Sequence, residues 1–174
     1  EDDISKEVIM AKSNNDSIGG IVQTAIVGLP VGVGEPWFSS LDSELAKAML
    51  SLGGIKGIEF GKGFKFADGF GSTMNDPLYY DGEKVVTKTN NSGGINGGIS
   101  NGMPVIFNLA VKPTPSISKK QSTIDLKTKE NIEIELKGRH DAAIIRRICP
   151  VVTALTAIVV CDLIALSFGK DYLK

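Results

Sequence analysis

The sequence is poor in histidine and cysteine, and this excludes several kinds of site. Its 174 residues contain one histidine, His140, so a metal site built from several histidines is excluded. The two cysteines, Cys149 and Cys161, stand in apolar surroundings without CxxC spacing. We therefore expect two buried thiols in a reducing, cytoplasmic location, and no metal centre.

An excess of either charge is also missing. Lys and Arg number 19 against 20 Asp and Glu, so no basic field for nucleic acid is present, and we expect no such partner. The start, EDDISKEVIMAK, carries no signal-peptide pattern and no initiator Met, which indicates a processed end or a fragment. Residues 148–168 are mostly apolar, but Pro150 and Asp162 interrupt them. We expect a buried core or interface helix there, with no membrane contact.

Length and composition favour one domain over residues 1–174, because 42% of the residues are hydrophobic. Apolar residues at helical spacing predict an amphipathic helix over residues 41–52 with Ser39 as its N-cap. Asp81-Gly82 predicts a hairpin turn. Strands are predicted at residues 18–29 (buried on both faces), 55–60, 84–88, 105–111 and 132–136, and a closing helix at 151–168. This order predicts an α+β fold with antiparallel sheet.

Three common nucleotide and hydrolase motifs fail. Around Gly61-Lys62, a P-loop would need a glycine where Lys56 stands. The run from Gly32 has Trp37 at the third glycine of a dinucleotide fingerprint. No GxSxG elbow is present, and nothing near His140 supports a nucleophile.

Residues 93–116 are the most informative stretch. Five glycines fall within residues 93–102, and a glycine cluster is typical of backbone that bends sharply or approaches a ligand closely. The stretch ends in Lys112-Pro113-Thr114-Pro115-Ser116, and Gly138-Arg139-His140-Asp141 follows downstream. Arginine, hydroxyls and backbone N–H groups suit a phosphate, and a carboxylate beside a cation suits a base.

We therefore expect the two polar segments and the glycine-rich backbone to face one common cavity that binds an anion. Each feature alone has a simpler reading. Taken alone, Lys112 and Arg139 favour surface ion pairs, His140 is compatible with a structural hydrogen bond, and the glycines are compatible with a tight loop.

Taken together, the segments are identified as those of a known family. The chain resembles the C-terminal half of chorismate synthase. The matching blocks occur in family order and comprise residues 16–20, 31–36, 41–49, 56–59, 71–76, 93–102, 112–116 and 138–141.

The resemblance implies a β-α-β sandwich with antiparallel sheets enclosing helices, of which this chain is an incomplete half. It also implies a homotetramer in the shikimate pathway of aromatic amino acid biosynthesis. The implied reaction is the anti 1,4-elimination that converts 5-enolpyruvylshikimate 3-phosphate to chorismate and phosphate. Reduced FMN is required without net redox change, and it comes from the enzyme itself or from an external flavin reductase.

The resemblance also implies roles for particular residues. The segment Lys112-Pro113-Thr114-Pro115-Ser116 corresponds to the family's flavin-binding segment, with Pro115 where serine is common. Gly97, Gly53 and Gly54 correspond to backbone contacts of the flavin. Arg139 corresponds to an arginine shared by flavin and substrate phosphate, and Asp141 to an aspartate that passes the proton away. His140 corresponds to a residue that supports both and the substrate.

Complete family members are about twice this length, and their N-terminal half supplies two acid/base histidines and further arginines. We therefore expect this chain alone to be inactive. Two other readings stay open. One is a non-catalytic flavin- or phosphate-binding module. The other is a structural fragment that self-associates through apolar faces.

Overall fold

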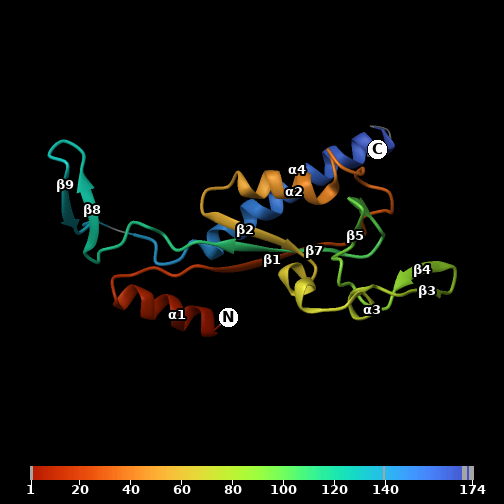
Figure 1. Ribbon diagram of the computed structural model, residues 1–174, viewed down its shortest axis with the longest axis horizontal. Helices are drawn as coiled ribbons and strands as arrows, with labels where there is room; N and C mark the ends of the chain where they lie inside the picture. Colours follow the sequence, from red (N-terminus) through yellow and green to blue (C-terminus); the bar gives the residue numbers. More distant parts are fainter. Residues whose placement is uncertain (1, 139, 170–171, 173–174) are drawn as a thin grey trace.

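A three-stranded antiparallel sheet lies at the centre of the molecule (Figure 1). The computed structural model describes residues 2–138, 140–169 and 172. The strand order is β1 (Gly20–Ile26), β7 (Val105–Val111) and β2 (Ile55–Phe60). The middle strand pairs with β1 along its whole length, from Val105 opposite Ile26 to Val111 opposite Gly20. The predicted strands at residues 55–60 and 105–111 are confirmed.

One face of the sheet is covered by two helices, α2 (Leu41–Leu50) and α4 (Ile145–Phe168) (Figure 1). Strand β7 alternates strictly, with every second side chain buried and the others half-buried. Phe107 is fully buried, and its ring centroid lies 5.8 Å from that of Phe60 on β2. The core cluster joins Val22, Leu29, Val33, Leu41, Leu45, Met49, Ile55, Ile95, Val105, Phe107, Leu109, Val111, Ile148, Val152 and Leu163.

Helix α2 forms as its pattern predicts, since Leu41, Leu45 and Met49 fall on its buried face. Its N-cap is Ser40, whose Oγ accepts a hydrogen bond from the backbone N–H of Ser43 (3.3 Å). The prediction of Ser39 was therefore off by one residue. The helix begins at Leu41, and a cap has to lie directly before the first helical residue.

Helix α4 begins at Ile145, six residues before the predicted start, and contains Pro150. By length and composition alone, α4 passes the criteria for a membrane-spanning helix. Within the structure, 17% of its most apolar 18-residue window is buried. Its buried residues are Ile148, Val152, Thr156 and Leu163. The expectation of buried thiols was wrong. Cys149 and Cys161 are both exposed, because they lie on faces of α4 that the described residues leave uncovered.

The other face of the sheet carries a row of polar side chains, which we call the amide row. Gln23 of β1 donates through Nε2 to Asn108 Oδ1 of β7 (3.0 Å), and Asn108 donates through Nδ2 to Glu59 Oε1 of β2 (3.1 Å). Ile21 on the same strand face as Gln23 is 65% exposed. The prediction that residues 18–29 are buried on both faces was therefore wrong, because only one face of β1 meets the helices.

Hairpins project from both ends of the sheet (Figure 1). The hairpin signal at Asp81-Gly82 is confirmed. The two-stranded units are β3 (Leu78–Asp81) with β4 (Lys84–Thr87), β5 (Ile95–Asn96) with β6 (Ile99–Ser100), and β8 (Gln121–Asp125) with β9 (Glu130–Ile134). The remaining elements are α1 (Asp2–Ser13), η1 (Gly63–Asp68) and α3 (Gly71–Met74). The fold mixes helices with small antiparallel sheets, as predicted, and the described residues supply one sheet layer and one helix layer.

Replacement of Phe107 by alanine tests the position of the core. We expect Phe107→Ala to lower the free energy of unfolding by about 3–5 kcal/mol, because it leaves a cavity under both helices. Phe64→Ala is the matched control. Phe64 is 86% exposed, so its loss is expected to change stability by no more than about 0.5 kcal/mol. Urea denaturation measures both, and equal destabilisation by the two variants would contradict the core described here.

Candidate functional site

The chain leaves β7 directly into the predicted flavin-binding segment, and two predicted glycines lie beside it. The backbone N–H of Lys112 donates to the carbonyl oxygen of Gly54 (2.8 Å). Gly54 has φ +95°, and a Cβ there would lie 2.9 Å from Cδ1 of Ile144. A Cβ on Gly53 would have no neighbour within 4 Å. The structure therefore brings Gly53, Gly54 and Lys112 together, with open space in front of Gly53.

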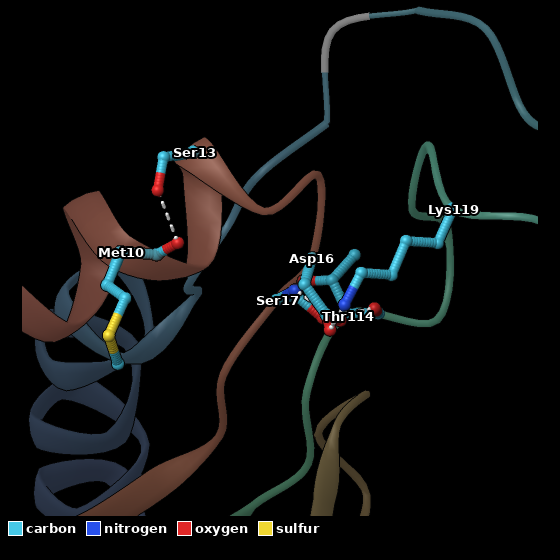
Figure 2. A network of polar contacts seen from close by, with 6 residues as sticks. All are labelled: Met10, Ser13, Asp16, Ser17, Thr114 and Lys119. Carbon is cyan, nitrogen blue, oxygen red and sulfur yellow. Dashed lines mark hydrogen bonds and ion pairs between the residues drawn. The ribbon is translucent and has the colours of Figure 1, made fainter.

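Residues 15–18, which we call the bridging turn, contact both polar segments, and Figure 2 shows the contacts of Asp16 and Ser17 on the side of Thr114. The hydroxyl of Ser17 donates to the carbonyl oxygen of Thr114 (2.6 Å). The carboxylate of Asp16 accepts from Lys119 Nζ (2.7 Å). On the other side, the backbone N–H of Ile18 donates to the carbonyl oxygen of Ala142 (2.8 Å). The segments around Thr114 and Asp141 are thus held next to each other.

The hairpin β8–β9 explains how these segments meet. Residues 112–118 enter the hairpin, and residues 136–138 and 140–142 leave it, so both segments lie at its base (Figure 1). Five residue pairs hold the hairpin, from Gln121 opposite Ile134 to Asp125 opposite Glu130. Antiparallel pairing therefore brings together polar groups that are more than 20 residues apart in the sequence.

A cavity of 220 Å³ opens between the bridging turn and the base of the hairpin. His140 faces it, and its Nε2 lies 3.3 Å from the carbonyl oxygen of Leu136. The lining residues are Lys12, Asn15, Asp16, Ile117, Ser118, Gly138, His140 and Ala142. The cavity therefore combines two charged side chains, polar groups and a half-buried imidazole.

One hydroxyl at this site lacks a partner. Thr114 Oγ1 is a buried side-chain oxygen for which the described residues provide no hydrogen bond. Leaving a buried polar group unpaired costs about 1–3 kcal/mol, so native proteins seldom retain one without reason. Together with the Lys112 cation and the open backbone of Gly53, this hydroxyl fits a phosphorylated ligand such as FMN. Pro113 and Pro115 are exposed on either side of Thr114 and stiffen the segment.

Asp141 forms an ion pair that the sequence did not predict. Its Oδ2 accepts from Arg147 Nη1 of α4 at 2.7 Å. Arg147 thus fixes the orientation of the Asp141 carboxylate.

Arg139 lies outside the described residues, so its place stays a prediction. Of the other side chains expected at one common cavity, His140 lines the 220 Å³ cavity, whereas Lys112, Thr114 and Asp141 are not among its lining residues. Ser116, two residues after Thr114, is half-buried.

Gly97 does not lie at this site. It occupies the turn between β5 and β6 with φ +58°, beyond the opposite end of β7 from Lys112. Seven strand residues at about 3.3 Å each separate the two ends by roughly 20 Å. The expected single cavity that includes Gly97 is therefore not formed within one copy. Gly54 beside Lys112 and Gly97 between β5 and β6 both adopt a positive φ that favours glycine. The glycine content alone therefore did not distinguish a turn at the site from a turn far from it.

The carboxylates of Asp16 and Asp76 accept hydrogen bonds near opposite ends of β7, and both have a lowered pKa. For Asp16, the hydrogen bond from Lys119 lowers the pKa most, and the backbone N–H of Ser17 adds to it. For Asp76, burial raises the pKa, but hydrogen bonds from Thr89 and from the backbone of Ser92 and Asn91 outweigh it and lower the pKa overall. Asp76 thereby holds residues 89–92, which lead into the glycine cluster.

Reasoning from the sequence missed Asp16, Ser17, Lys119 and Arg147 as parts of the site. The sequence indicated residues 16–20 only as one of the matching blocks. The available signal was a carboxylate and a hydroxyl next to a buried strand. Their partners lie far away in sequence, 97 residues on for Ser17 and 103 for Asp16.

Known proteins similar to this chain share one description. The family model described as chorismate synthase matches residues 1–165. The chain is 52% identical over 164 residues to the chorismate synthase of Methanocaldococcus jannaschii, covering 94% of this chain and 43% of that protein. It is 51% identical over 157 residues to that of Methanosarcina barkeri, covering 90% and 43%.

The fold agrees with these similarities. A solved structure described as the crystal structure of chorismate synthase matches with a TM-score of 0.78 and 28% sequence identity. The match covers 98% of this chain and 44% of that chain. The chain thus spans less than half the length of the relatives it matches.

The ion pair of the bridging turn yields a prediction about pH. Lys119→Met is expected to raise the pKa of Asp16 toward its ordinary value of 3.8. Because the folded pKa lies below the unfolded one, the pair stabilises the protein above pH 3.8, and this stabilisation is lost as pH falls through the folded pKa.

NMR titration of the carboxyl groups measures this shift. Lys120→Met is the control, since Lys120 lies 3.9 Å from Glu133 and is a neighbour of Lys119 in the sequence. An unchanged pKa of Asp16 in Lys119→Met would show that the ion pair does not form in solution.

Proposed function

Because the chain belongs to the chorismate synthase family, we propose that it forms the flavin- and phosphate-binding part of that enzyme. The proposed reaction converts 5-enolpyruvylshikimate 3-phosphate to chorismate and phosphate. A C–O bond to phosphate and a C–H bond on the ring both break, and a conjugated double bond forms. The protein therefore has to hold a leaving dianion, remove a proton and exclude water.

The residues around Thr114 are assigned to reduced FMN. Lys112 supplies the charge that balances its phosphate, and Thr114 Oγ1 supplies a hydrogen bond that the protein leaves open. The backbone at Gly53 lets a planar ring approach closely, because no other group lies within 4 Å of the position that a Cβ would occupy there. When bound, reduced FMN supplies the electron density that eases the departure of the phosphate.

The second segment is assigned to the substrate and the proton. Arg139 suits bidentate contacts with a phosphate, and His140 lies at the neighbouring cavity. Asp141 would accept the proton that leaves the ring. Its ion pair with Arg147 fixes the direction of the carboxylate, which makes Arg147 a positioning residue.

The observation that carries this proposal is the unpaired hydroxyl of Thr114, held in place by Ser17 from the bridging turn. We further assign the chain to a cytoplasmic homotetramer with the sandwich fold of the family. In this assignment the described sheet and helices form two of its layers. Either the enzyme or an external reductase supplies the reduced flavin.

A chimera tests the flavin site. This chain replaces the matching 43% of the Methanocaldococcus jannaschii enzyme, and reduced FMN is titrated anaerobically. Thr114→Val is expected to weaken binding roughly 3- to 10-fold, because one neutral hydrogen bond contributes about 0.5–1.5 kcal/mol. Thr128→Val, in the exposed turn of the β8–β9 hairpin, is the matched control and should bind as the parent does. Equal affinity in both variants would remove Thr114 from the site.

The same chimera tests the division of labour. With reduced FMN and 5-enolpyruvylshikimate 3-phosphate, the chimera is expected to form chorismate. Residues 1–174 alone are expected to form none, because the acid/base histidines of the family lie in the part that they do not match. Chorismate formation by residues 1–174 alone, detected by its absorbance in a stopped assay, would refute this division.

A further inference from the structure

The bridging turn leads into β1 through Gly19 and Gly20, and neither position needs glycine for its backbone conformation. Both have a φ outside the left-handed region, so alanine would adopt the same backbone without strain. What glycine supplies at these positions is space. A Cβ on Gly19 would lie 2.4 Å from the carbonyl oxygen of Val111 and 3.0 Å from Cδ of Pro113. The chain is therefore pressed against the backbone that leads into residues 112–116, the predicted flavin-binding segment.

The other side of the bridging turn meets the segment that carries Asp141. The backbone N–H of Ile18 donates to the carbonyl oxygen of Ala142 (2.8 Å), the residue directly after Asp141. Within the described part of the chain, residues 112–118 and 140–142 share no direct hydrogen bond. The turn therefore lies between the two segments, and the room that it takes up sets the distance from one to the other.

A methyl group added to Gly19 would move the turn and not the strand. Val111 is paired with β1 on one side and with β2 on the other, so its carbonyl oxygen is fixed from both sides. The ring of Pro113 is rigid as well. Because close-packed backbone does not compress, the turn has to shift by roughly 1 Å to reach an ordinary contact distance. The hydrogen bond of Ile18 passes that shift to the segment of Asp141.

We propose that Gly19 is a positioning residue: by lacking a side chain, it sets the distance between residues 112–116 and the Asp141 carboxylate. The inference rests on the proposed function, in which this carboxylate would accept the proton that leaves the ring. Proton transfer requires hydrogen-bond distances, and a misplacement of about 1 Å can lower a rate about 100-fold. Gly19 acts on the reaction only through the two segments that it separates.

Gly19→Ala in the chimera tests the inference by separating the kinetic constants. Titration with reduced FMN counts the active sites, and kcat is expressed per site. We expect kcat to fall roughly 10- to 100-fold, because the carboxylate is displaced. The KM for 5-enolpyruvylshikimate 3-phosphate and the affinity for reduced FMN should change less than about 3-fold, because Lys112 and Gly53 keep their places beside the sheet. A variant that merely unfolds would lose sites and keep its kcat per site.

Two alanine variants at other glycines are the controls. Gly71→Ala, at the start of α3, adds a Cβ with no neighbour within 4 Å and should behave as the parent chimera does. Gly20→Ala adds a Cβ at 2.4 Å from Cδ1 of Ile145, the far end of a flexible side chain that rotates away. There we expect kcat to fall less than about 3-fold, although the initial contact is as close as at Gly19.

Crystal structures of the parent and Gly19→Ala chimeras measure the spacing directly and do not depend on turnover. The Cα–Cα distance between Thr114 and Asp141 is expected to grow by roughly 1 Å in the variant. An unchanged distance would overturn the inference, as would a kcat per site equal to that of the parent. An equal loss of kcat in Gly20→Ala would also overturn it.

A further variant removes a contact instead of adding a group, in case Gly19→Ala does not fold. Ser17→Ala deletes the hydrogen bond from the turn to the carbonyl oxygen of Thr114 (2.6 Å) and leaves the packing at Gly19 intact (Figure 2). Its kcat per site is expected to fall roughly 3- to 10-fold, and Ser17→Thr, which keeps the hydroxyl, should restore it. Ser13→Ala, which deletes the bond from Ser13 to the carbonyl oxygen of Met10 (2.8 Å), is the matched control.

Failure of this inference is distinguishable from failure of the proposed function. No chorismate from the parent chimera would refute the proposed function, and the distance from Thr114 to Asp141 would still decide the inference. An active parent chimera whose kcat is unaltered in Gly19→Ala and Ser17→Ala would refute the inference alone.

Discussion

The pairing of β7 with two neighbours at once determines where everything else in this protein lies. Hydrogen bonds to β1 and β2 fix its register, and strict alternation fixes which side chains face α2 and α4. A shift of one residue would turn Phe107 and Leu109 away from the helices and bring Asn108 among them. The register of β7 therefore controls the core on one face, the amide row on the other, and the point at which Lys112 leaves the sheet.

The functional site depends on this strand and on two contacts that close a long loop. The β8–β9 hairpin brings the segments around Thr114 and Asp141 to one place, and the bridging turn binds both through backbone and side-chain hydrogen bonds. Neither segment has secondary structure of its own at these positions. The two segments are held by these contacts rather than by a helix or strand beneath them, so Ser17 and Asp16 act as structural anchors.

The sequence predicted best where one element decides its own structure. The alternation of β7, the spacing of Leu41, Leu45 and Met49, and the Asp81-Gly82 turn are local signals, and the structure contains all three elements. Predictions failed where burial depends on distant chain. Cys149 and Cys161 have apolar neighbours in the sequence but are exposed, because no described residue covers those faces of α4. Residue types indicated Lys112 and Thr114 as candidate ligand-binding residues, and this stays a prediction. The separation of Gly97 from them depends on the length of β7 in space, which residue types do not give.

Because of the amide row, the two faces of the central sheet favour different kinds of packing partner. Gln23, Asn108 and Glu59 satisfy one another in a line across all three strands, and a second oxygen of Glu59 accepts from the backbone of Phe64 (3.3 Å). Dehydrating such a line is costly unless the incoming surface replaces each lost water bond. This side therefore favours a hydrated neighbour, with bridging solvent in the seam, while the helix side favours a dry one. The single three-stranded sheet thus separates a hydrated face, which carries the amide row, from an apolar face, which packs against the helices.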